Sequence, residues 1–125
     1  ELALIERIPE SVPEGSMILV NPWQGGGLVY AFANRPVSQF YMFHDPNAEI
    51  EFLNENLNRI NEDAQVCSVL EDKSIRYVLV LETWYISNGK RQDQYVGLLG
   101  LEDEAGFKIL DQEGDNVLME IYACD

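Results

Sequence analysis

Three short segments with the composition of buried strands are spaced along the first two thirds of the chain. They are Met17 to Val20, Val37 to Phe40 and Ile75 to Thr83. Their aliphatic, aromatic and β-branched residues are typical of strands that are covered on both faces of a sheet. A glycine-rich turn follows the first segment, and we interpret the apolar stretch that begins at Gly26 as a short helix.

Helical periodicity fills the region between the second and the third segment. Asp45 and Pro46 form a favourable helix start, as N-cap and first helical residue. Apolar residues then recur at spacings of three and four; they are Ile50, Leu53, Leu57 and Ile60. A second helix is predicted from Asp63 to Asp72, with an inward face formed by Val66, Cys67, Val69 and Leu70.

The two ends of the chain add a helix and a hairpin. Residues 1–8 have helical periodicity, and we expect Pro9 to break this helix. Phe107 to Asp111 and Val117 to Tyr122 flank a turn-forming segment, a pattern typical of a β-hairpin. In the first of these strands, alternation places Phe107 and Ile109 on the same face.

These elements predict an α/β fold with a mostly parallel central sheet flanked by helices, extended by a C-terminal antiparallel β-hairpin. A chain of 125 residues is long enough for one hydrophobic core and too short for two. We therefore expect residues 1–125 to form a single domain. Because the sequence begins inside a periodic helix, residues 1–10 are interpreted as the end of a helix that continues from an upstream region.

The charge balance excludes one large class of partners. Asp and Glu number 22 against eight Lys and Arg, a formal net charge of −14. A nucleic-acid-binding protein needs clustered cations to neutralise phosphates, and the only adjacent basic pair is Lys90 and Arg91. Nucleic acid is therefore not an expected partner.

The order of several short motifs resembles that of a known family. They are Val12-Pro13-Glu14-Gly15-Ser16, Asn21-Pro22-Trp23-Gln24-Gly25, Tyr30-Ala31, Val66-Cys67, Ile75-Arg76-Tyr77-Val78-Leu79, Gly106-Phe107 and Ile121-Tyr122-Ala123-Cys124. Their order is similar to that in the C-terminal extracytoplasmic domain of a family of multi-pass actinobacterial membrane proteins of unknown function. Those proteins resemble glycosyltransferases of the GT-C type, which use lipid-linked sugar donors. The resemblance implies a domain at the cell membrane, on the extracytoplasmic side, whose partner is its own upstream transmembrane region.

The resemblance also bears on Cys67 and Cys124. In a reducing cytosol two cysteines would be read as small buried thiols. On the extracytoplasmic side they could instead form a disulfide, which would tie the hairpin to the helical layer. The extracytoplasmic location implied by the resemblance favours the disulfide.

Ligands of open parallel sheets bind beyond the carboxyl ends of the strands. In the predicted fold these ends carry aromatic, amide and acidic side chains, namely Trp23, Gln24, Tyr41, His44, Glu82 and Trp84. Aromatic faces beside hydrogen-bonding groups suit a sugar, so a cell-envelope glycan is one candidate ligand for this edge. The alternative is that these side chains only pack against the core.

Signals for catalysis and for metal binding are weak. His44 is the only histidine, and no serine lies in a nucleophile elbow. Gly25 to Gly27 lack the spacing of a nucleotide-binding loop, and the acidic clusters lack the spacing of a calcium-binding loop. We therefore expect no catalytic residue, no metal and no cofactor in this domain. The leading interpretation is a non-catalytic domain that binds a glycan or packs on the membrane portion; a stand-alone small-ligand-binding domain is the alternative, and an enzyme ranks third.

Overall fold

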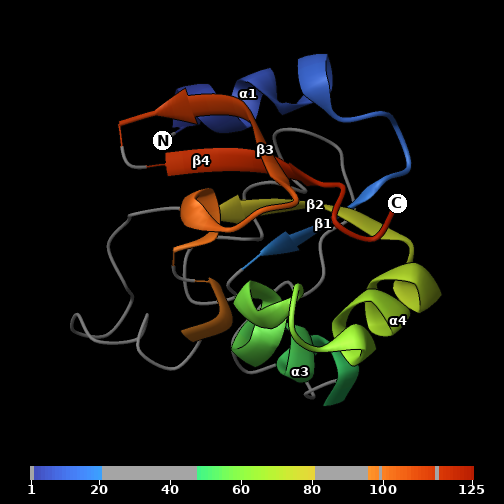
Figure 1. The fold of residues 1–125 in the computed structure, drawn as a ribbon. Coiled ribbons are helices and arrows are strands. Elements are labelled where there is room, and N and C mark those ends of the chain that lie inside the picture. Colours follow the sequence, from blue (N-terminus) through green and yellow to red (C-terminus); the bar gives the residue numbers. More distant parts are fainter. Residues whose placement is uncertain (1, 21–47, 81–95, 99, 115) are drawn as a thin grey trace.

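Four strands form one sheet in the order β1-β2-β4-β3 (Figure 1). The computed structural model describes residues 2–20, 48–80, 96–98, 100–114 and 116–125. Within them the strands are β1 (Met17–Val20), β2 (Ile75–Val80), β3 (Phe107–Glu113) and β4 (Asn116–Ile121). β1 and β2 are parallel, whereas β4 is antiparallel to both of its neighbours, β2 and β3.

The expectation of a mostly parallel sheet is therefore wrong for the described strands. The reason is the position of the hairpin: β4 pairs directly with β2, through Tyr77↔Glu120 to Val80↔Val117, and places β3 at the edge. Two of the three strand pairings are thus antiparallel. The expected strand from Val37 to Phe40 and the expected helix from Gly26 lie outside the described residues.

Helix α1 (Leu2–Ser11) covers one face of the sheet (Figure 1). Its side chains Leu4, Ile5 and Ile8 are fully buried against residues of β1, β2 and β4. The prediction that Pro9 breaks the helix is wrong. Pro9 lies inside α1, which continues to Ser11. Pro9 has no amide to donate, so one backbone hydrogen bond of the helix is missing, but the next turn still closes, because the amide of Val12 bonds the carbonyl of Ile8 at 2.9 Å.

The opposite face is covered by α3 (Ala48–Asn56), the 3₁₀ turn η2 (Leu57–Arg59) and α4 (Ala64–Lys73) (Figure 1). The predicted apolar positions Ile50, Leu53, Leu57 and Ile60 are all buried there. The α-helix itself ends at Asn56, whose side-chain amide donates to the carbonyl of Phe52 at 2.9 Å. The predicted start at Asp45 and Pro46 lies outside the described residues. Two further 3₁₀ turns, η4 (Val96–Leu98) and η5 (Leu101–Asp103), place Leu98 and Leu101 in the same core.

The second predicted helix is confirmed as α4. Asp63 is its N-cap, and its carboxylate accepts a hydrogen bond of 3.0 Å from the amide of Gln65. Of the predicted inward residues, Val66, Val69 and Leu70 are buried and Cys67 is half-buried. The helix ends at a left-handed C-cap.

The C-terminal hairpin is also confirmed, with Gly114 at a φ of 60° in its turn. Phe107 is buried, whereas Ile109, which alternation places on the same face, is 45% exposed. β3 is an edge strand of the described sheet, so Ile109 has a neighbouring strand on one side alone. An irregularity between Ile109 and Asp111 interrupts the alternation, and Leu110 packs toward the α1 side of the sheet.

Candidate functional site

A disulfide joins α4 to the segment after β4. Cys67 lies in α4, Cys124 follows β4, and their α-carbons are 5.5 Å apart, within the range that a disulfide requires. The predicted pairing is confirmed. It ties the segment after β4 covalently to α4.

A pocket of about 360 Å³ lies beside this disulfide. Its apolar part is formed by Leu70, Ile75 and Ile121, all of which are buried members of the core. Cys124 contributes to the wall. We call this cavity the disulfide pocket.

The rest of the pocket lining is polar and exposed to solvent. Arg76 and Asp125 form an ion pair with 3.0 Å between Nη2 and Oδ2, and both side chains are about half exposed. This hydrogen bond raises the pKa of the Arg76 guanidinium above its usual value. Glu71 and Ser74, from the end of α4 and its C-cap, complete the lining.

The disulfide pocket is not at the edge of the sheet that the sequence predicts for ligand binding. Ile75 and Arg76 begin β2, whereas the predicted site residues follow the carboxyl ends of strands: two come after Val20 of β1, two after Val80 of β2 and two after the expected strand from Val37 to Phe40. All six predicted residues lie outside the described part of the chain: Trp23, Gln24, Tyr41, His44, Glu82 and Trp84. The predicted site therefore stays a prediction.

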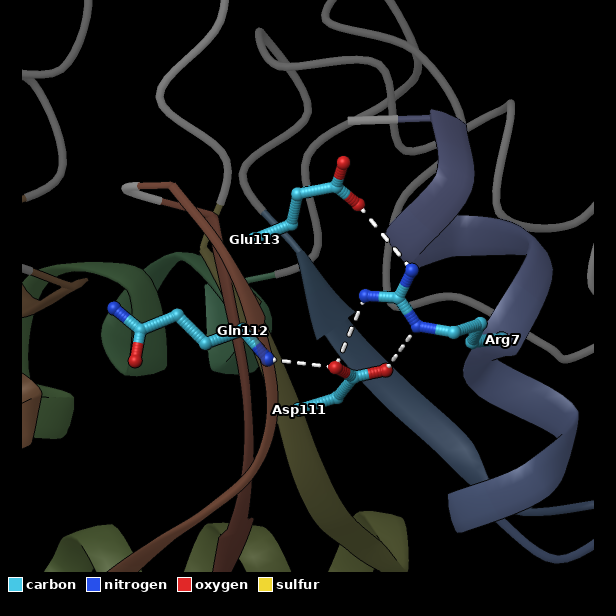
Figure 2. A network of polar contacts seen from close by, with 4 residues as sticks. All are labelled: Arg7, Asp111, Gln112 and Glu113. Carbon is cyan, nitrogen blue, oxygen red and sulfur yellow. Dashed lines mark hydrogen bonds and ion pairs between the residues drawn. The ribbon is translucent and has the colours of Figure 1, made fainter.

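A second polar cluster lies on the opposite side of the molecule, where α1 packs on β3. Figure 2 shows Arg7 of α1 directed at Asp111 and Glu113. Arg7 binds both carboxylate oxygens of Asp111, from Nε at 2.8 Å and from Nη2 at 3.0 Å, and reaches Glu113 at 3.3 Å. Asp111 also accepts the amide of Gln112 at 2.8 Å.

These contacts determine the charge state of the cluster. The hydrogen bond from Arg7, assisted by the amide of Gln112, holds the pKa of Asp111 below its usual value despite partial burial. The pKa of Arg7 is raised, chiefly by its hydrogen bond to Asp111. Because the ionised groups bind one another, we interpret the cluster as a clamp that fixes α1 on the hairpin.

The described residues contain no group of three or more His, Cys, Asp or Glu side chains placed to hold a metal ion. In the same ranges, no helix is both long and apolar enough to cross a membrane.

The sequence interpretation missed Ser74, Arg76 and Asp125 as pocket residues. They are separated in the chain, and none belongs to a recognisable motif. One signal was present: the Cys67–Cys124 pairing, once assumed, brings residues 121–125 to the end of α4 and the start of β2. A pocket lined by these three segments follows from that placement.

Comparisons with known proteins agree with this architecture. The sequence pattern of a family of unknown function (DUF6541) matches residues 1–123. The chain belongs to this family. No curated protein matches the sequence.

Among solved structures, the fold is similar to the C-terminal globular domain of an oligosaccharyltransferase from Archaeoglobus fulgidus. The TM-score is 0.59, the sequence identity is 13%, and the match covers 96% of this chain and 93% of that one. At this identity the likeness is one of fold. The glycosyltransferase-like, actinobacterial and membrane parts of the expectation stay predictions.

Proposed function

We propose that this chain is a non-catalytic, extracytoplasmic domain of a membrane-bound, glycosyltransferase-like protein. The observation that carries the proposal is the fold match, which spans nearly all of both chains and whose partner is itself a C-terminal domain of an oligosaccharyltransferase. The domain acts by non-covalent contact, holding a cell-envelope glycan beside the membrane portion or packing on that portion.

The disulfide supports the extracytoplasmic part of this proposal. Disulfides persist in oxidising compartments and are rare in the cytosol. Cys67 and Cys124 are half-buried and join segments 57 residues apart. A structural bond of this kind is expected in a domain that folds outside the cytoplasmic membrane.

The clamp around Arg7 supports the role of a docked domain. The bidentate contact to Asp111 and the buried residues Leu4, Ile5 and Ile8 fix α1 on the sheet. Any chain that precedes α1 would therefore have a defined direction relative to the domain. This is what packing on an upstream membrane portion requires.

The test is topology mapping of the whole gene product in its host. Lys108 is exposed on the edge strand β3, so a Lys108→Cys variant offers a thiol to a membrane-impermeant maleimide. We expect equal labelling in intact spheroplasts and after permeabilisation, with the protein retained in carbonate-washed membranes. The unaltered protein is the control for labelling of other thiols.

Two results would contradict the proposal. Labelling that appears only after permeabilisation would place the domain in the cytoplasm. Recovery of the protein in the wash, with no membrane-bound fraction, would favour the stand-alone small-ligand-binding domain.

A further inference from the structure

The disulfide pocket has the size and the composition of a small-molecule site. Its volume of about 360 Å³ lies in the range typical of ligand pockets, which combine an apolar lining with a few polar groups. Leu70, Ile75 and Ile121 form its apolar floor, with 2–3% of each residue exposed. The polar groups of the lining are the hydroxyl of Ser74, the guanidinium of Arg76 and the carboxylates of Glu71 and Asp125.

The backbone at Ser74 is the second observation. Ser74 has φ 58° and ψ 40°, and it is the sole non-glycine residue with positive φ in the described chain. The left-handed C-cap of a helix favours glycine, because a side chain there costs energy. Here the position carries a serine that lines the pocket. Strained residues of this kind concentrate at ligand-binding sites, where the side chain has a use that glycine cannot supply.

The charges of the lining restrict the ligand. One guanidinium, Arg76, stands against two carboxylates, Glu71 and Asp125. A phosphate or another anion would meet a net negative lining on a chain of charge −14. A neutral ligand with several hydroxyl groups can instead donate to the carboxylates and accept from Arg76, while its C–H surface lies on the aliphatic residues.

We propose that the disulfide pocket binds a neutral saccharide unit, with hydroxyl groups held by Ser74, Arg76 and Asp125. The choice of a saccharide among neutral polyols rests on the function proposed above. The site itself rests on the geometry of the pocket. It is separate from the aromatic edge predicted from the sequence.

The disulfide gives this site a dependence on oxidation. Asp125 directly follows Cys124, so the bond to Cys67 fixes the carboxylate that pairs with Arg76. Reduction releases the tail from α4 and removes one wall of the pocket. Ligand binding therefore requires the oxidised protein.

The experiment is an NMR titration of the oxidised 125-residue chain with N-acetylglucosamine. We expect saturable shifts of the amide signals of Ser74, Arg76 and Asp125, which disappear after reduction. Asp125→Asn should weaken binding about tenfold, because a hydrogen bond to a charged group is lost. The matched control is Asp72→Asn, an exposed residue of α4 outside the pocket with the same charge change, which should leave affinity unchanged.

Ser74→Gly separates binding from folding. It should raise the thermal unfolding midpoint, because the left-handed backbone is relieved, and at the same time weaken binding. Absence of saturable shifts with the oxidised protein, or binding that survives both Ser74→Gly and Asp125→Asn, would overturn the proposal. Tighter binding of the cationic glucosamine than of the neutral N-acetylglucosamine would also overturn it, because the pocket would then favour a cation over a neutral ligand. None of these results bears on the topology experiment, so the two proposals can fail independently.

Discussion

Loss of the disulfide should lower the stability of the domain by a large fraction of its total. The bond closes a loop with a sequence separation of 57 residues. In the chain-entropy treatment such a cross-link removes roughly 14 cal/mol/K from the unfolded ensemble, or about 4 kcal/mol at 25 °C. Domains of this size have a free energy of unfolding of roughly 5–15 kcal/mol, so the loss amounts to between about a quarter and four fifths of the total.

The same figure predicts a thermal shift. An unfolding entropy of about 2.1 cal/mol/K per residue gives roughly 0.26 kcal/mol/K for 125 residues. A loss of about 4 kcal/mol then lowers Tm by roughly 15 °C. Substitution to alanine is preferred to serine, because both cysteines pack against the core.

The assay is thermal unfolding followed by circular dichroism for the oxidised protein, the reduced protein and the Cys67→Ala/Cys124→Ala double variant. Each single variant should match the double variant, since either one breaks the same bond. Reduction of the double variant is the control and should have no effect. A difference below about 3 °C between the oxidised protein and the double variant would refute the loop-closure reasoning.

Three further predictions concern single residues, each tested by urea unfolding. Asn54 is fully buried, and its side-chain nitrogen and oxygen have no hydrogen-bond partner among the described residues. Because a buried polar group without a partner is destabilising, Asn54→Leu should stabilise the fold by about 1–3 kcal/mol. Destabilisation by this substitution would mean that the amide has a partner. A β-carbon at Gly97 would overlap the backbone of α3 at Asn56, so Gly97→Ala should cost about 1–3 kcal/mol, whereas Gly114→Asn, in open space at φ 60°, should be nearly neutral. The pKa of Asp111 is lowered in the folded state, so the ionised carboxylate stabilises the fold above its unfolded pKa of about 3.9, and this stabilisation is lost as the pH falls through the folded pKa. The difference in unfolding free energy between the unaltered protein and Asp111→Asn should therefore shrink between about pH 6 and pH 2. A difference that stays constant with pH would contradict the clamp.

Local elements were predictable from the sequence because their signals are local. The Asp63 cap and the spacing of Val66, Val69 and Leu70 define α4 without reference to the rest of the fold. The strand order was not predictable in the same way. No feature of the sequence from Val117 to Ile121 indicates that this strand pairs with β2. That antiparallel pairing is what makes the sheet mixed. The exposure of Ile109 follows from the same fact, since it depends on β3 being at the edge.

The site shows the same division. The Cys67–Cys124 disulfide could be proposed from the sequence, because the proposal depends only on the presence of two cysteines and on an oxidising compartment. The disulfide pocket needs the C-cap of α4, the first residues of β2 and the tail after β4 to meet in space, and Ser74 attracts no notice until its backbone conformation is known. Residue types alone therefore pointed to aromatic side chains, whereas the described pocket is lined by aliphatic and charged ones.

The direction of the parallel pair makes the two glycan hypotheses separable. β1 and β2 run side by side, so their carboxyl ends at Val20 and Val80 share one edge, while the disulfide pocket lies at the start of β2, at the other end. A titration that shifts the indole signals of Trp23 and Trp84, and is weakened by Trp23→Ala, would assign the glycan to the carboxyl edge. A titration that shifts the amide signals of Ser74 and Arg76, with shifts that disappear on reduction of the disulfide, would assign the glycan to the pocket. Ser74 and Arg76 lie at the start of β2 and Val80 at its other end, so shifts confined to the start of β2 support the pocket, and shifts confined to the residues that follow Val20 and Val80 support the site predicted from the sequence.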